Sequence, residues 1–255
     1  MPDLAVVTGA AGGIGSAVAA RLRADGFTVV GIDRAEADLT DEAAVLSVFR
    51  GIGTVAVLVH CAGVTAGAPA HATSLTDWRA VLDTNLTSAF LCARAVLPGM
   101  LHEGRGVIVT IGSVHGHAFQ PGYPAYAAAK AGLAAFTRQL AVEYGRSGVR
   151  AVTISPGWVR TPDTLTRVTD PNDLARLAET QLAGEPAHVA DAVAFAVSPA
   201  AALLTGTEIV LDGGASAVQP AALLRPGPRA RLGLPPLTEA RPRPGPEPIG
   251  PDQIS

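Results

Sequence analysis

The chain has 255 residues, with 19 basic and 22 acidic side chains and a formal net charge of −3. Its hydrophobic content of 48% and charged content of 16% are typical of a folded protein and argue against disorder in most of the chain. A slightly acidic chain lacks the basic patch that nucleic-acid binding needs. No uninterrupted apolar run reaches the roughly 18 residues of a membrane-spanning helix. We therefore expect neither nucleic-acid nor membrane partners.

The N-terminal residues run directly into a strand-like apolar segment without a preceding basic stretch, which argues against a signal peptide. Cys61 and Cys92 lie in a predicted strand and a predicted helix and have no metal-ligand spacing. We expect both to be reduced, buried thiols in a cytoplasmic protein. No metal site is expected.

Strand and helix patterns alternate along the chain. The expected strands cover residues 4–8, 28–32, 55–60, 106–111, 149–154 and 207–211. A helix should follow the first strand and end near Asp25, and further helical patterns cover 41–50, 76–102, 124–146, 163–182 and 186–197. Short buried strands that alternate with helices indicate a parallel sheet covered on both faces. The sequence predicts an α/β fold, a Rossmann-like doubly wound parallel sheet in a single domain.

One connection is unusually short. Only four residues separate Asp33, at the end of the second strand, from Asp38. A crossover between parallel strands needs about a dozen residues. Either no third strand forms here or it is a stub at the sheet edge, and the helix usual at this point of such folds should be missing.

The C-terminal part is rich in proline, since 10 of the 20 prolines fall within residues 217–255. Proline disfavours helices and central strands. We therefore divide the chain into a folded domain, 1–216, and an extension, 217–255. Residues 217–237 retain apolar groups and either pack along a subunit, at an interface, or are disordered; 238–255 are expected to be disordered.

A glycine-rich turn joins the first strand to the first helix, in the sequence Thr8-Gly-Ala-Ala-Gly-Gly-Ile-Gly15. Glycines permit a tight turn and a close approach of pyrophosphate, and the free N–H groups of a helix N-terminus favour its negative charge. Asp33 closes the second strand 18 residues after Gly15, where a carboxylate can accept hydrogen bonds from the adenosine ribose hydroxyls and would repel a 2′-phosphate. The pattern favours NAD over NADP, unless Asp33 merely caps the following turn.

Tyr126 and Lys130 stand one helical turn apart on the same face of a predicted helix. A phenol is a poor base at neutral pH, and a neighbouring cation favours the phenolate. Ser113, at the end of the preceding strand, could reach the same substrate oxygen. Such a pair is often only part of a surface helix, but Lys130 lies in an alanine-rich stretch and is the only lysine in the chain.

Together these motifs give a resemblance to the short-chain dehydrogenase/reductase family over residues 4 to about 214. The matching positions are the turn at 8–15, Asp38-Leu39, Ala62-Gly63, Asn85, Ser113, Tyr126 with Lys130, Pro156-Gly157 with Thr161, and Asp212-Gly-Gly214.

The resemblance implies an oxidoreductase that interconverts a secondary alcohol and a ketone with NAD(H). Tyr126 would be the general acid/base, Ser113 would position the substrate oxygen, and Lys130 would hold the nicotinamide ribose and stabilise the tyrosinate. Asn85 would hold a water that links Lys130 to solvent. The cofactor would further contact Gly9, Gly13, Ile14, Gly15, Asp33, Asp38, Leu39, Ala62, Gly63, Pro156, Gly157, Val159 and Thr161.

The chain departs from the family pattern in three places. The family usually has Asn-Asn-Ala-Gly where this chain has His60-Cys-Ala-Gly63, which puts local packing in doubt more than activity. The missing helix after Asp33 should leave the adenine pocket more open. The family commonly ends soon after Asp-Gly-Gly, whereas 41 residues follow Gly214 here.

Other side chains are candidates for substrate contact. His115 and His117 follow Ser113 and either line the substrate pocket or belong to a plain loop; Trp158 and the segment 163–185 occupy the family's substrate lid. Substrate binding is therefore assigned to Ser113, His115, Tyr126 and Trp158. Small residues along 125–135 would let two helices pack closely across a two-fold axis, consistent with a homodimer or homotetramer.

Three alternatives stay open. The chain could be an NADPH-dependent 3-oxoacyl reductase, which Asp33 disfavours. It could be a catalytically idle dinucleotide-binding scaffold or sensor, for which loss of part of the Asn85, Ser113, Tyr126 and Lys130 set would be expected. A nucleotide-sugar epimerase or dehydratase is disfavoured by the spacing of the glycine-rich turn.

Overall fold

The computed structural model describes residues 3–168, 182–218, 225–231, 233–234 and 236. Its internal contacts divide the chain into two units, Met1–Ser216 and Ala217–Ser255. Most of the predicted lid at 163–185 and most of the extension beyond residue 218 lie outside the described residues. Within the second unit, the structure describes a short helix α10, Pro226–Arg231.

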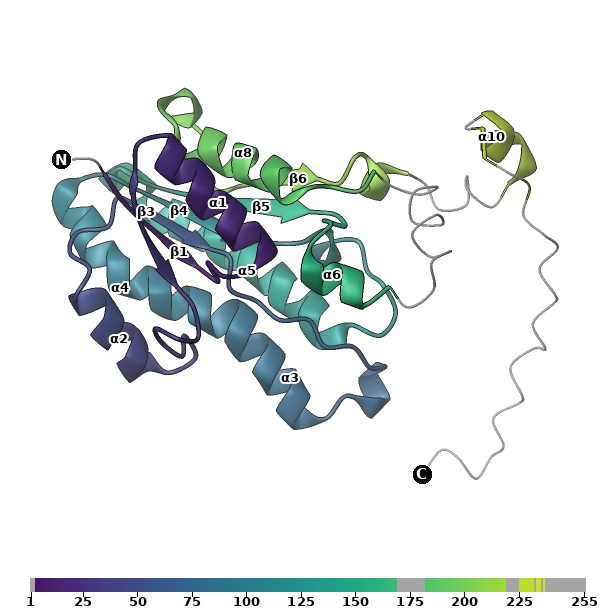
Figure 1. Ribbon diagram of the computed structural model, residues 1–255, viewed down its shortest axis with the longest axis horizontal. Coiled ribbons are helices and arrows are strands. Elements are labelled where there is room, and N and C mark those ends of the chain that lie inside the picture. The colour runs from purple at the N-terminus through teal and green to yellow at the C-terminus, as the bar shows by residue number, and fades with distance from the viewer. Residues whose placement is uncertain (1–2, 169–181, 219–224, 232, 235, 237–255) are drawn as a thin grey trace. The chain divides into compact units, whose positions relative to one another are not determined.

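The first unit is built on one six-stranded sheet in which every strand pairing is parallel (Figure 1). Its strands are β1 (Leu4–Thr8), β2 (Thr28–Ile32), β3 (Val57–His60), β4 (Gly106–Ile111), β5 (Val149–Pro156) and β6 (Thr207–Leu211), in the order β2-β1-β3-β4-β5-β6. The predicted strands are confirmed. The fifth is longer than expected because Pro156 still pairs with Leu211 of β6.

Alternate strand residues face opposite layers of helices, as they do in a sheet buried on both sides. Ala5 and Val7 of β1 pack on one side with α1 (Gly13–Ala24) and α8 (Pro186–Val197). Val6, between them, packs on the other side with α2 (Glu42–Arg50), α4 (Ser88–Glu103) and α5 (Pro124–Tyr144). Figure 1 shows α1 and α8 together on one face. The doubly wound fold is thus confirmed.

The helical stretch predicted over 76–102 is interrupted. It consists of α3 (Leu75–Leu82), a π-helical segment Asp83–Thr87, and α4. By length and composition alone the run Leu75–Glu103 could cross a membrane, but half of its most apolar window is buried within the fold, as in a core helix. The π segment places Asn85 in the interior, at 0% exposure.

The region after β2 is short, as the sequence predicts. Among the described residues no strand or helix lies between Ile32 and Glu42, and β2 forms the edge of the sheet. Ala37 and Leu39 are buried against the core, so this loop replaces the missing elements as a cover for the α2 side.

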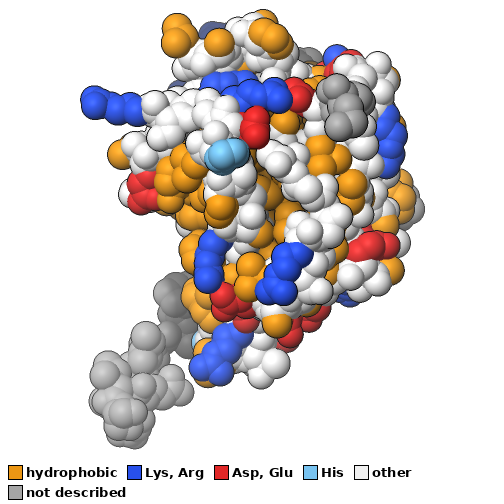
Figure 2. Space-filling view, turned by 90° about the vertical axis from the view of Figure 1, so that its left-hand side faces the viewer, with side chains coloured by type: hydrophobic (Ala, Val, Ile, Leu, Met, Phe, Trp, Pro, Cys, Tyr) orange, Lys and Arg blue, Asp and Glu red, His pale blue; other side chains and the backbone are white. Residues whose placement is uncertain are grey.

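The helix predicted over 163–182 begins as α6 (Pro162–Thr166), whose first turn is capped by Thr161, and this helix ends at Thr166. On the face of the molecule drawn in Figure 2, basic and acidic side chains are interspersed rather than gathered by sign. That distribution agrees with the small net charge.

Candidate active site

The glycine-rich turn folds closely on itself and on its neighbours. Gly9 has φ +63°, and a Cβ there would lie 2.8 Å from the backbone nitrogen of Ala62. A Cβ on Gly15 would lie 2.1 Å from the Gly9 carbonyl oxygen, and one on Gly13 would lie 2.8 Å from Thr161 Cγ2. Only glycine fits these positions, and the turn therefore brings the start of α1 against Ala62 and Thr161.

Helix α1 begins without a side-chain cap, because its N-cap residue is Gly12. The first N–H groups of a helix have no partner within the helix, and here no side chain accepts from them through the cap. Such an N-terminus favours an anion. The first backbone N–H groups of α1 can therefore bind an anionic ligand, and the glycines of the turn leave the space in front of them free of side chains.

Asp33 connects the end of β2 to this turn. One of its carboxylate oxygens accepts a hydrogen bond of 2.9 Å from the backbone N–H of Ala11 in the turn. The other oxygen accepts from the N–H of Arg34, also at 2.9 Å. The carboxylate therefore does more than cap its own turn: it is held beside the glycine-rich turn, and each oxygen keeps a free lone pair for a hydroxyl donor.

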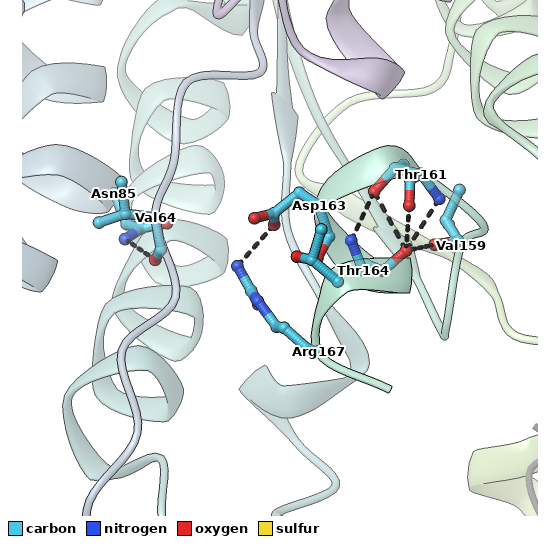
Figure 3. Close-up of polar contacts among 8 residues, drawn as sticks. Val64, Asn85, Val159, Thr161, Asp163, Thr164 and Arg167 are labelled. Carbon is cyan, nitrogen blue, oxygen red and sulfur yellow. Dashed lines mark hydrogen bonds and ion pairs between the residues drawn. The ribbon is translucent and has the colours of Figure 1, made fainter. Parts of the chain in front are cut away.

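The segment Ala62-Gly63, which lies against Gly9 of the turn, also runs past Asn85. The Asn85 amide donates to the carbonyl oxygen of Val64, at 2.8 Å (Figure 3), and to that of Val81, at 2.9 Å. These two bonds fix the orientation of the amide, and its Oδ1 is buried without a partner among the described residues. A Cβ on Gly63 would lie 2.6 Å from that oxygen and 3.5 Å from Lys130 Nζ. Gly63 thus stands between Asn85 and the only lysine.

Tyr126 and Lys130 both lie on α5, as predicted. Lys130 is buried, with 5% exposure, and its ammonium donates a 2.8 Å hydrogen bond to the carbonyl of Ile111 at the end of β4. It lies 5.5 Å from the centre of the Tyr126 ring. A buried ammonium with one protein acceptor has two further N–H groups for other partners. Its environment is that of a binding group rather than of a surface charge.

Ser113 lies where β4 gives way to a short 3-10 turn, Val114–Gly116. Its hydroxyl accepts a 3.2 Å hydrogen bond from the N–H of His115. This turn packs directly on α5, since a Cβ on Gly116 would lie 3.3 Å from backbone atoms of Lys130 and Ala131. The close approach carries Ser113 and His115 to the side of α5 that bears Tyr126.

His115 stands between two tyrosines. Its ring centre is 5.7 Å from that of Tyr126, edge-on, and 5.7 Å from that of Tyr123. Burial lowers the pKa of His115 below its ordinary value, so the ring is neutral at physiological pH. His117 instead turns towards β6, with its Nδ1 3.4 Å from Glu208. Of the two histidines, His115 is the one placed beside the Tyr–Lys pair.

The loop after β5 closes the site from the other side. Val159 and Thr161 are buried, and Thr161 exchanges hydrogen bonds with Thr164 at the start of α6 (Figure 3). The carbonyl of Trp158 accepts from the N–H of Gly184, at 2.8 Å, so the two ends of the predicted lid lie side by side. Pro156 is the last residue of β5, and Gly157 follows it directly.

These residues fit a dinucleotide cofactor. The uncapped α1 and the glycines of the turn provide a cradle that any side chain would fill, and Asp33 holds a carboxylate next to it. The unpartnered Asn85 oxygen and the spare donors of Lys130 provide unused polar groups at the far end. Asp38, by contrast, is exposed, and its carboxylate accepts hydrogen bonds from Thr40 in its own loop.

The sequence did not reveal two features of this region. The first is a buried chain of hydrogen bonds through His60, described below. The second is a hollow of about 270 Å³ lined by Ala70, Thr73, Leu75, Trp78 and Pro124. It borders the start of α5, two residues from Tyr126. No motif marks either feature, because both arise from tertiary contacts. Among the described residues no cluster of side chains could hold a metal ion.

Comparison with known proteins agrees with this geometry. A family model described as enoyl-(acyl carrier protein) reductase matches residues 35–216. The chain is 35% identical over 251 residues to 2-(R)-hydroxypropyl-CoM dehydrogenase of Xanthobacter autotrophicus, covering 86% of this chain and 100% of that protein. It is 34% identical to a 3-oxoacyl-(acyl-carrier-protein) reductase of Vibrio cholerae, covering 83% and 96%.

A solved structure gives the same result. The fold superposes with a TM-score of 0.81 on an oxidoreductase from Burkholderia thailandensis, at 38% identity, covering 87% of this chain and 95% of the other. That protein is described as a member of the short-chain dehydrogenase/reductase family. Matches of this extent show the family. The chain belongs to the short-chain dehydrogenase/reductase family and is an NAD(P)-dependent oxidoreductase that acts at an alcohol or ketone group.

Proposed function

We propose that the protein oxidises a secondary alcohol, or reduces the matching ketone, with NAD(H) and with Tyr126 as the general acid/base. The observation that carries this proposal is the buried Lys130 ammonium, 5.5 Å from the Tyr126 ring and bonded to the end of β4. The ammonium and the phenol can thus act on the same bound alcohol, with Tyr126 accepting its proton.

Each remaining residue has a role in the same step. Ser113 holds the substrate oxygen opposite the phenol, where a hydroxyl stabilises negative charge on it. The two spare donors of Lys130 would hold the ribose hydroxyls of the cofactor, and Asn85 Oδ1 would accept from a water that carries the proton onward to solvent. The cofactor would supply the acceptor or donor of the hydride. His115 and Trp158 border the substrate.

The preference for NAD over NADP is part of the proposal and rests on Asp33. Its carboxylate is fixed beside the turn by Ala11 and Arg34. A 2′-phosphate placed there would meet a negative charge, whereas ribose hydroxyls would meet an acceptor. Arg34 is the neighbouring cation, but its position after Asp33 gives the carboxylate the closer contact with the turn.

We also infer a homo-oligomer. Apolar side chains are exposed on α4 and α5, where Phe90 is 45% and Val142 is 78% exposed. A second exposed set lies on α8 and β6, with Phe195 at 48% and Val210 at 42%. Patches on two sides of the same unit are suited to two different two-fold contacts. Sedimentation of wild type and of Phe90→Ser tests this: the variant should lose a contact, and a monomeric wild type would contradict it.

The activity is tested by measuring NADH formation with a panel of secondary alcohols. Wild type should act on at least one of them, and Tyr126→Phe should reduce kcat about 10²–10⁴-fold, the usual contribution of a general acid/base. Tyr144→Phe, at the other end of the same helix, is the matched control and should retain activity. Equal rates for Tyr126→Phe and wild type would overturn the mechanism; tight NAD binding with no turnover would favour an idle scaffold.

A further inference from the structure

His60 lies at the C-terminal end of β3, between β1 and β4, with 1% of its surface exposed. Both ring nitrogens have partners. Nδ1 lies 3.0 Å from the hydroxyl of Thr8 at the end of β1, and Nε2 lies 3.2 Å from the hydroxyl of Ser88 at the start of α4. The ring therefore joins the strand that leads into the glycine-rich turn to the helix that follows Asn85.

The neighbouring bonds decide where the ring proton lies. The Ser88 hydroxyl donates to the carbonyl of Thr84, at 2.6 Å, and a carbonyl can only accept. The Ser88 oxygen must then accept from His60, so Nε2 carries the proton. Nδ1 is consequently the bare nitrogen and accepts from the Thr8 hydroxyl. The Thr8 oxygen in turn accepts from the N–H of Ala62, at 3.2 Å.

The result is a buried chain with one direction, from the Ala62 N–H through Thr8, His60 and Ser88 to the Thr84 carbonyl. A positively charged ring, with protons on both nitrogens, would force Thr8 to give up its role as donor. Burial and the charge of Lys130 lower the pKa of His60 to about 3, so the ring is neutral in the folded protein. The direction of the chain is therefore maintained at physiological pH.

Both ends of this hydrogen-bond chain lie at the candidate site. Ala62 adjoins Gly63, which lies against Asn85 Oδ1 and Lys130 Nζ. The backbone nitrogen of Ala62 is also the atom nearest to a Cβ that would be placed on Gly9 of the turn. Thr84 is the residue before Asn85 in the π-helical segment. Its carbonyl accepts the hydrogen bond of the Ser88 hydroxyl. The imidazole of His60 thus links the Ala62-Gly63 segment to the π-helical segment that carries Asn85.

We propose that His60, with its proton on Nε2, is a positioning residue that holds Ala62-Gly63 on one side and the Asn85 turn on the other. It touches neither substrate nor cofactor. Its two nitrogens act on different parts of the site, because Thr8 supports the segment beside the turn and Ser88 supports Asn85. The kinetic part of this inference rests on the proposed function, whereas the position of the proton does not.

The proton position is tested by ¹⁵N NMR of the histidine rings. The chain has only six histidines, and the His60 signals are those missing from the His60→Asn variant. We expect an unprotonated Nδ1 and a protonated Nε2, with both shifts unchanged between about pH 5 and pH 8. A protonated Nδ1, or shifts that titrate in this range, would overturn the proposal. The measurement needs neither cofactor nor substrate.

The positioning role is tested with two variants that each keep one end of the chain. In His60→Asn the side-chain oxygen can occupy the place of Nδ1, which keeps Thr8 and loses Ser88. In His60→Gln the amide can occupy the place of Nε2, which keeps Ser88 and loses Thr8. We expect His60→Asn to lower kcat and His60→Gln to raise the KM for NAD, each on the order of tenfold.

A purely structural histidine would not separate the two effects. Equal changes of kcat and KM in both variants, or wild-type kinetics with only a lower melting temperature, would overturn the positioning role. The Kd for NAD, measured by calorimetry, reads the Thr8 end even if no substrate is turned over; a Kd that His60→Gln leaves unchanged would likewise contradict it. If instead the proposed function is wrong, wild type will show no turnover, while the NMR result for His60 will still be as expected.

Discussion

The two ends of the candidate site are built differently. At the end that contains Tyr126, Lys130 and Asn85 are buried and held by hydrogen bonds to backbone carbonyls, while Tyr126 itself is half-buried between them and the surface. At the end that contains Asp33, the sheet terminates at β2, and the loop that follows is short and largely exposed. Proton transfer requires a fixed geometry, whereas a choice between two cofactors can depend on one charge. All the residues of the first end are present, whereas the second end, among the described residues, lacks the strand and helix usual after β2 in such folds.

The largest effect is expected at the end that contains Tyr126, where Lys130 is buried. Lys130→Arg should lower kcat by about 10²–10⁴-fold, because a guanidinium cannot fit the buried site of a compact ammonium beside Tyr126. Arg138→Lys, an exposed exchange on the same helix, is the matched control. Steady-state NADH formation measures both. Activity near wild type in Lys130→Arg would mean that this end is less strictly fixed than the contacts indicate.

At the open end, the expected effect is on selectivity and not on turnover. Asp33→Ala should shift the ratio of kcat/KM for NAD over NADP by about 10²-fold towards NADP, since a repulsion of a few kcal/mol disappears. Glu42→Gln removes a negative charge at the start of α2, outside the turn, and should leave the ratio unchanged. If both variants shift the ratio alike, the preference comes from the general field of this region and not from Asp33.

The buried end should also be recognisable from the pH dependence of stability. The pKa of His60 is about 3 in the folded state and near its ordinary value when unfolded, so the unfolded state binds the extra proton below about pH 6.5. Stability is therefore complete above that pH and falls as the pH decreases. Between about pH 7.5 and 5 the wild type should lose about 2 kcal/mol more than His60→Asn. Urea unfolding at both pH values measures this; parallel losses would mean that His60 ionises in the folded protein.

The smallest effect is expected at the surface, away from both ends. Arg94 and Glu42 form an ion pair of 2.6 Å between α4 and α2, with both side chains 54% exposed. Arg94→Ala should change the free energy of unfolding by less than about 1 kcal/mol, and less still at high salt. Urea unfolding at two salt concentrations checks this. A larger loss would show that α2, which follows the reduced loop, depends on this pair.

Periodicity and motif spacing predicted the strands, the helical layers and the reduced region after Asp33, because each depends on local pattern. They could not show that Asn85 lies in a π-helical turn, since nothing in the surrounding residues differs from an ordinary helix. The same holds for Gly116, whose role is a contact with α5. Such features arise only when distant segments meet.

His60 shows the limit most clearly. From the sequence it is a departure from the family's asparagine that puts packing in doubt. In the structure its two nitrogens satisfy Thr8 and Ser88, which lie 52 residues before it and 28 residues after it. An isolated residue type says little about a hydrogen-bond chain whose other members are ordinary hydroxyls.

The most direct test of alcohol oxidation by NAD, with Tyr126 as the general acid/base, traces the transferred hydride. An alcohol from the active panel, deuterated at its carbinol carbon, is incubated with NAD and the enzyme, and the reduced cofactor is analysed by mass spectrometry. We predict deuterium in the NADH formed by wild type, and a rate of labelling reduced about 10²–10⁴-fold by Tyr126→Phe. Unlabelled NADH, or equal labelling in both proteins, would contradict it.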